Sequence, residues 1–265
     1  MNLKLRLDGC TVAYSDSGGT GRPVLFLHGA GVDHAMFEQQ VGAVSSSGRR
    51  SVTWDMRAHG LSRPNTSPIT ANQLVSDAES VIAALGLSRP VLVGHSLGGN
   101  IAQELIRRNP AGFSAMAVMD ATWNAGPLSS VERLLLRLAA PMLALVPERF
   151  LPEVMAKASA VTPSGRSDLA RAFAQVPKRE FLAIWRSTVS LVSPAPDYRT
   201  PVPLLLVVGD RDRTGNIAKA MPAWARHEGT REVVIPEAGH VPSQDSPAAV
   251  TEALLRFLDS LDQDR

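Results

Sequence analysis

Short, mostly apolar segments recur along the chain, separated by longer stretches in which apolar residues follow a helical spacing. The segments at 24–27, 90–93, 113–119 and 204–208 have the length and composition of strands buried on both faces of a sheet. Residues 70–85 instead place apolar side chains three and four positions apart, as one face of a helix does. This alternation predicts an α/β fold, with a parallel sheet covered by helices on both faces.

Two regions depart from that alternation. At the amino terminus, residues 3–7 and 11–15 alternate around an Asp-Gly pair, which predicts a β-hairpin. Between residues 121 and 200 the pattern predicts helices only, at 131–146 with a kink near Pro141, 150–158, 167–176 and 178–192. Leucines and Met142 run almost round the first of these helices, so we expect it to be buried on more than one face.

The most informative motif follows the apolar segment at 90–93. Residues 94–98 read Gly-His-Ser-Leu-Gly, and a helical pattern begins directly after Ser96. Glycine on both sides leaves room for a strained turn that holds a serine hydroxyl out into a cleft. A serine hydroxyl alone is a weak nucleophile, so the motif needs a base and an oxyanion site elsewhere in the chain.

Four further segments stand in the order that such a motif requires. They are His-Gly-Ala-Gly at 28–31, the loop at 55–62, Gly-Asp-Arg-Asp at 209–212 and Ala-Gly-His at 238–240. With these segments the chain resembles the α/β-hydrolase family, in its esterase and lactonase-like branch. The resemblance implies a mostly parallel twisted sheet of about eight strands. It further implies a core domain of residues 1–120 and 201–265, and a helical cap, residues 121–200, inserted between strands six and seven.

The resemblance also assigns a catalytic triad. Ser96 is the expected nucleophile, His240 the general base and Asp212 the acid that orients the histidine. The chain order Ser, Asp, His is that of this fold. Asp210, nearer the strand end, and Asp120, at the end of the preceding strand, are alternatives for the acid.

The supporting residues follow from the same resemblance. The backbone N–H groups of Leu97 and Ala30 are expected to form the oxyanion hole. In the loop at 55–62 we expect an ion pair between Asp55 and Arg57 that braces the site.

Under a cap, one face of an apolar helix can line the substrate pocket. We expect substrate-binding walls from four side chains, Trp123, Trp185, Leu138 and Met142. The alternative is that these residues pack only within the cap and against the core.

The composition limits the classes of partner and cofactor that we expect the protein to bind. A formal charge of +2 and the lack of a basic tract give nucleic-acid binding no support. The only cysteine is Cys10, and the six histidines lack ligand spacing, so we expect no metal. The resemblance implies no cofactor. Residues 1–8 lack the apolar region of a secretory signal and no apolar stretch approaches about 20 residues, so we expect neither a leader nor a membrane span. We therefore expect a cytoplasmic enzyme without a membrane span, as a monomer or homodimer.

The resulting hypothesis is a serine hydrolase that cleaves a carboxylic ester, lactone or related acyl bond of a small to medium hydrophobic substrate. One alternative is hydrolysis of a carbon–carbon bond in a diketone, which Val241, in place of an aromatic after His240, disfavours. Perhydrolase or haloperoxidase activity is another, because it uses the same triad. A ligand receptor with a slow triad is the alternative outside enzymology.

Overall fold

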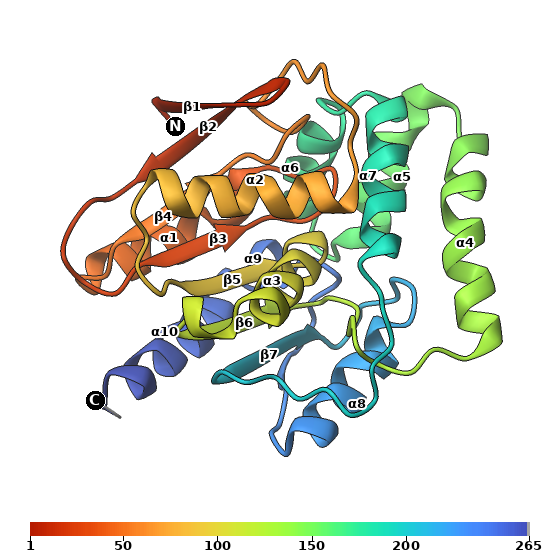
Figure 1. The fold of residues 1–265 in the computed structure, drawn as a ribbon. Helices are drawn as coiled ribbons and strands as arrows, with labels where there is room; N and C mark the ends of the chain where they lie inside the picture. The colour runs from red at the N-terminus through yellow and green to blue at the C-terminus, as the bar shows by residue number, and fades with distance from the viewer. Residues whose placement is uncertain (264–265) are drawn as a thin grey trace.

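The structure, a computed structural model, describes residues 1–263 and is built on one eight-stranded sheet (Figure 1). In the sheet the strands lie in the order β1-β2-β4-β3-β5-β6-β7-β8. Their bounds are β1 (Leu3–Leu7), β2 (Cys10–Asp16), β3 (Val24–Leu27), β4 (Ser51–Trp54), β5 (Val91–His95), β6 (Ala115–Met119), β7 (Leu204–Gly209) and β8 (Val233–Ile235). The β1–β2 and β2–β4 pairs are antiparallel and the others parallel, which confirms the predicted hairpin and the mostly parallel sheet.

Helices cover both faces of this sheet, as predicted. Figure 1 shows α2 and α3 in front of the strands, with α1, α9 and α10 behind them. The bounds in this part of the chain are η1 (His34–Phe37), α1 (Glu38–Ser46), α2 (Ala71–Ala84), α3 (Leu97–Arg108), η2 (Pro110–Gly112), α8 (Ile217–Glu228), α9 (Pro242–Asp245) and α10 (Pro247–Gln263). None of the helices within residues 1–263 combines the length and the apolar character that a membrane crossing requires.

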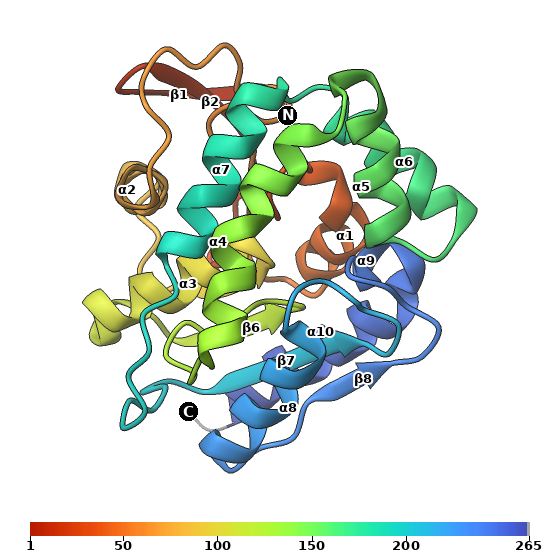
Figure 2. The same ribbon diagram turned by 90° about the vertical axis from the view of Figure 1, so that its right-hand side faces the viewer.

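The segment from residue 121 to 200 forms helices and no strand, and we call it the helical insertion. Its elements are α4 (Ser130–Leu145), η3 (Glu148–Phe150), α5 (Leu151–Ser159), α6 (Pro163–Phe173) and α7 (Lys178–Ser190). The insertion leaves the sheet after β6 and returns at β7, and Figures 1 and 2 show it beyond one end of the strands. Ser129 and Glu132 form a reciprocal capping box that fixes where α4 begins.

One expectation about α4 is wrong. We expected its apolar residues to be buried on more than one face, but Ala140 is the only buried residue among its sixteen. The helix packs chiefly against α7, and its opposite side meets no other element of residues 1–263 (Figure 2). Apolar periodicity shows which residues share a face; it does not show that a second element covers that face.

The centre of the molecule is packed so closely that backbone meets backbone. A Cβ atom added at Gly98 would lie 1.9 Å from the carbonyl oxygen of Leu27, and one at Gly94 would lie 2.5 Å from that of Gly98. Glycine at these positions lets α3 sit directly against β3 and β5. The first turn of α3 is thereby fixed relative to the sheet.

Candidate active site

Ser96 occupies the sharp turn between β5 and α3. Its φ of 49° and ψ of −116° lie in a region that non-glycine residues seldom adopt. The close approach of Gly94 to Gly98 leaves no room for side chains beneath this turn. The surrounding packing therefore holds the strained backbone in place, and the Ser96 side chain lines a cavity outside it.

The structure brings Ser96, His240 and Asp212 into one hydrogen-bonded chain. His240 Nε2 lies 3.1 Å from Ser96 Oγ, and His240 Nδ1 lies 3.0 Å from Asp212 Oδ2. Asp212 follows β7 and His240 follows β8, so two neighbouring parallel strands deliver these residues to the same edge of the sheet. The distances suit proton transfer from the serine to the histidine.

Asp212 is the charged member of this chain. Burial alone would raise its pKa, but the adjacent His240 and hydrogen bonds from His240 and Thr214 lower the pKa of Asp212 to about 2. The ionised carboxylate can accept from Nδ1–H, an arrangement that points Nε2 at Ser96 Oγ to receive the serine proton.

The two alternative acids lie differently. Asp120 is fully buried, accepts a hydrogen bond of 3.0 Å from the Gly209 N–H, and offers an oxygen within 4.8 Å of ligand atoms of Asp212 and His240. Burial and the charge of Asp212 raise the pKa of Asp120 well above its usual range, which favours its protonated form. Asp210 is exposed. Of the three candidates, Asp212 is the one that contacts the histidine.

Two buried histidines support the loop that follows β3. His59 Nε2 accepts a 2.9 Å hydrogen bond from the Gly31 N–H, and His28 Nε2 accepts one of 2.9 Å from the Met56 N–H. Burial lowers the pKa of both rings, that of His59 to about 3. Both therefore stay neutral at ordinary pH and can act as acceptors. This bracing fixes the backbone next to Ala30.

Ala30 and Leu97 flank the serine from two sides. Ala30 lines the same cavity as Ser96. Leu97 begins α3, and the first N–H groups of a helix have no partner within the helix. Its side chain is fully buried, so the backbone is the part of Leu97 available near the serine. The N-terminal end of α3 also favours negative charge at this point.

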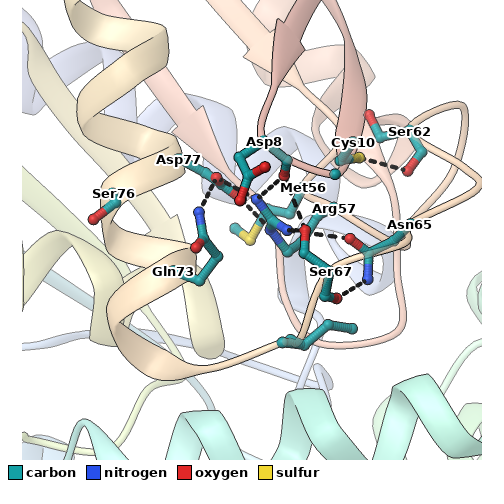
Figure 3. A network of polar contacts seen from close by, with 12 residues as sticks. Asp8, Cys10, Met56, Arg57, Ser62, Asn65, Ser67, Gln73, Ser76 and Asp77 are labelled. Carbon is teal, nitrogen blue, oxygen red and sulfur yellow. Dashed lines mark hydrogen bonds and ion pairs between the residues drawn. The ribbon is translucent and has the colours of Figure 1, made fainter.

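The expected ion pair between Asp55 and Arg57 is wrong. Arg57 instead forms a two-pronged pair with Asp77 of α2, at 2.5 and 2.6 Å, and Figure 3 shows its further hydrogen bonds to Asn65, Ser67 and the carbonyl oxygen of Asp8. Asp55 accepts from the backbone N–H groups of Leu61 and His34 at 2.8 Å. The motif could not reveal a partner twenty residues away on a helix.

A cavity of about 250 Å³ opens beside Ser96, lined mainly by apolar side chains. The insertion contributes one wall, which contains Glu132, Leu135, Leu136 and Ala139 of α4, and Trp185, Thr188, Val189 and Val192 from α7 and the residues after it. The remaining lining comes from Ala30, Asn100 and residues 214–217 of the core and from Thr122 at the start of the insertion. Trp185, one of the four expected substrate-binding residues, is among these lining residues.

Three of the expected pocket residues lie elsewhere. Trp123 is buried and stacks on Trp224, with ring centroids 6.2 Å apart, away from the serine cavity. Leu138 and Met142 are exposed on the outer side of α4, at 42% and 63%. Leu136 and Ala139 line the cavity from the neighbouring face of α4, and Leu135 lies at the border between that face and the exposed one. The sequence lacked a signal for this, because the leucines run nearly all round the helix.

Comparison with known proteins supports the fold described above. A model of the alpha/beta hydrolase family matches residues 24–253. Over 112 residues the chain is 35% identical to a non-heme haloperoxidase of Rhodococcus erythropolis, a match that covers 42% of this chain and 40% of that protein. Three such curated relatives are matched over only 34% to 40% of their own lengths.

Two solved structures share the fold across almost the whole chain. A thermophilic esterase from Thermogutta terrifontis is 24% identical, with 95% of this chain and 94% of that chain covered and a TM-score of 0.75. The enol-lactonase from Burkholderia xenovorans LB400 is 22% identical, with 97% and 100% covered and a TM-score of 0.79. Because the family match runs from β3 into α10 and includes every strand that carries the site, the chain belongs to the alpha/beta hydrolase family.

Proposed function

We propose that the protein is a serine hydrolase that cleaves a carboxylic ester or lactone of small to medium size and apolar character. The observation that carries the proposal is the chain of hydrogen bonds from Asp212 through His240 to Ser96, which ends at an apolar cavity. Membership of the alpha/beta hydrolase family supports a hydrolase role. In this proposal residues 121–200 act as a cap, and the rest of the chain as the catalytic core.

The proposed reaction begins with acylation. Ser96 Oγ attacks the substrate carbonyl carbon while its proton passes to His240 Nε2. The carbonyl oxygen becomes negatively charged and is held by the N–H groups of Leu97 and Ala30. When this intermediate collapses, the carbon–oxygen bond to the alcohol breaks and His240 returns the proton to the leaving oxygen. Asp212 stabilises the imidazolium throughout.

Deacylation repeats these steps with water. His240 removes a proton from water, whose oxygen attacks the acyl carbon, and the proton then returns to Ser96 Oγ as the acid leaves. With a lactone the alcohol and the acid belong to one molecule, so a single hydroxy acid is released. The cavity of about 250 Å³ favours substrates at the small end of the range for ligand pockets.

The direct test is hydrolysis of p-nitrophenyl esters from acetate to decanoate by wild type, Ser96→Ala and Ser190→Ala. Ser190 is an exposed serine at the end of α7 and serves as the matched control. We expect Ser96→Ala to lose activity by about 10⁴-fold or more, since the nucleophile is gone, while Ser190→Ala retains it. Wild type that is folded yet inert towards every ester would contradict the proposal.

The haloperoxidase relative favours a second candidate, perhydrolase activity. In that reaction hydrogen peroxide replaces water in deacylation, so the acyl group leaves Ser96 as a peracid, which can oxidise halide. Adding acetate, hydrogen peroxide and bromide and following bromination of a dione distinguishes the two. Bromination that depends on Ser96, together with negligible ester turnover, would favour this candidate.

A further inference from the structure

Figure 2 shows no element of residues 1–263 in front of the outer side of α4. This side carries a continuous stripe of exposed apolar residues. We call it the α4 stripe, and it consists of Val131, Leu134, Leu135, Leu138, Met142 and Leu145. Each of these residues has another member three or four positions away, and together they span about 100° of the helix circumference. Each is between 42% and 83% exposed. Single exposed apolar residues are ordinary, but a contiguous stripe of this kind marks a surface that binds something.

The charges beside the stripe are positive. Arg133 and Arg137 lie on the exposed side of α4, one helical row from the stripe, and neither forms an ion pair within residues 1–263. The only acid of α4, Glu132, is held at the other edge by Ser129 and Lys219. Residues 121–200 contain ten Lys and Arg against six Asp and Glu, a formal charge of +4 in a chain whose total is +2.

An apolar stripe flanked by arginines is the pattern of a helix that lies in the surface of an anionic lipid layer. Its leucines and methionine reach the acyl chains, and its arginines reach the phosphates. A second copy of this chain fits the stripe less well. The helix of sixteen residues is about 24 Å long, so a stripe about 10 Å wide offers roughly 250 Å². A stable dimer buries about 800 Å² per partner.

The α4 stripe is also continuous with the catalytic cavity. Leu135 belongs to the stripe and lines the cavity, and Leu136 and Ala139 line it from the adjacent face of the same helix. The helix is therefore the one wall that separates the space beside Ser96 from the exposed stripe. A lipid layer in contact with the stripe would lie directly against this wall.

We propose that the α4 stripe docks the protein onto an anionic lipid surface, with Arg133 and Arg137 at the headgroup phosphates. This interaction is separate from the proposed hydrolysis, because binding requires neither Ser96 nor turnover.

The first test is co-sedimentation with vesicles of phosphatidylcholine alone and of phosphatidylcholine with about 30% phosphatidylserine. Wild type is expected to sediment with the anionic vesicles and to remain in the supernatant when the vesicles are neutral. Leu134→Ser with Leu145→Ser removes two stripe residues that do not line the cavity, and should weaken binding by about tenfold or more. Leu3→Ser with Val234→Ser, at exposed positions on β1 and β8, is the matched control and should bind as wild type does.

The charges are tested in the same way. Arg133→Gln with Arg137→Gln should reduce binding to anionic vesicles by about tenfold, and raising the salt concentration should narrow the difference between wild type and variant. Arg6→Gln with Arg231→Gln removes two exposed arginines outside the insertion and should leave binding unchanged.

A second measurement does not depend on how a variant affects affinity. Met142→Cys allows a fluorophore sensitive to polarity to be attached on the stripe, since Cys10 is buried and burial raises the pKa of its thiol. The label should shift to the blue on anionic vesicles and be quenched by lipids brominated in their acyl chains. Absence of vesicle binding, equal binding to neutral vesicles, or an unchanged label would overturn the proposal. So would a dimer that Leu134→Ser with Leu145→Ser abolishes while lipid has no effect.

Discussion

Helices α3 and α4 both border the cavity beside Ser96, yet the molecule holds them in opposite ways. Ten of the twelve residues of α3 are buried, whereas α4 buries one residue of sixteen. The first turn of α3 touches the backbone of β3 at distances that allow no side chain. The wall that α4 provides depends chiefly on α7.

This difference suggests that the residues that would carry out the reaction and those that would select the substrate lie on different parts of the molecule. The parts that would perform the reaction are fixed by the sheet, by glycines and by buried hydrogen bonds, as preorganised catalysis requires. The part that would shape the pocket lies on α4, which buries only one of its residues, and substitutions at exposed positions cost little stability. Changes on the α3 side should therefore affect rate or folding, and changes on the α4 side should affect selectivity.

The largest expected effect concerns the acid. Asp212→Asn should lower kcat for an activated ester by about 10⁴-fold, because an amide in place of the ionised carboxylate favours the wrong tautomer of His240. Asp210→Asn, at an exposed position two residues away, should change kcat by less than about twofold. Comparable losses in the two variants, measured by steady-state kinetics, would show that the assignment is mistaken.

The close packing of α3 gives the next effect. Gly98→Ala would place a methyl group 1.9 Å from the Leu27 carbonyl oxygen, so we expect it to lower the free energy of unfolding by about 3 kcal/mol or more. Gly42→Ala in α1 meets nothing within 4 Å and should raise it by about 0.5–1 kcal/mol. Urea denaturation measures both free energies of unfolding. Equal values for the two variants would contradict the conclusion that α3 is packed more closely than other helices.

The buried histidines predict a dependence of stability on pH. The pKa of His59 is about 3 in the folded protein and about 6.5 in the unfolded chain, so below pH 6.5 the unfolded state binds a proton that the folded state does not. Stability should fall as the pH drops from 6.5 towards 3. In His59→Gln the slope between pH 4 and 6 should be smaller by about 1.4 kcal/mol per pH unit, the value for one proton. An unchanged slope in denaturation curves would contradict the prediction.

The smallest effect on stability is expected on α4. Ala139→Phe should fill part of the cavity and shorten the acyl chain that is hydrolysed best, while changing the free energy of unfolding by less than about 1 kcal/mol. Ala144→Phe lies on the exposed side of the same helix and should leave the chain-length optimum in place. If both variants shift the optimum equally, the position of Ala139 in the cavity wall is not the cause.

The sequence was sufficient for the sheet and for the placement of the three central residues. Parallel strands end at one edge, so the residues after β5, β7 and β8 meet there, and the order of Ser96, Asp212 and His240 follows. The strained turn at Ser96 could also be predicted, because the flanking glycines are residues that such a closely packed turn requires.

What the sequence could not provide depends on contacts between distant elements. Arg57 pairs with Asp77 of α2 and not with Asp55, because the direction of its side chain is set by how α2 packs. Trp123 stacks on Trp224, more than a hundred residues away, and so leaves the cavity. The orientation of α4 was hidden because its apolar residues lie on nearly every side. Only its packing against α7 determines which of them face the cavity and which remain exposed.

The measurement that tests the central claim most directly is detection of the acyl group on Ser96. Wild type mixed with excess p-nitrophenyl butyrate is quenched in acid within milliseconds, digested and analysed by mass spectrometry. We predict that the peptide containing Ser96 gains the mass of one butyryl group, less one hydrogen, and that Ser96→Ala shows no gain at any serine. A wild-type peptide that stays unmodified while p-nitrophenol is released in a rapid burst, or an acyl group on another residue, would contradict the account.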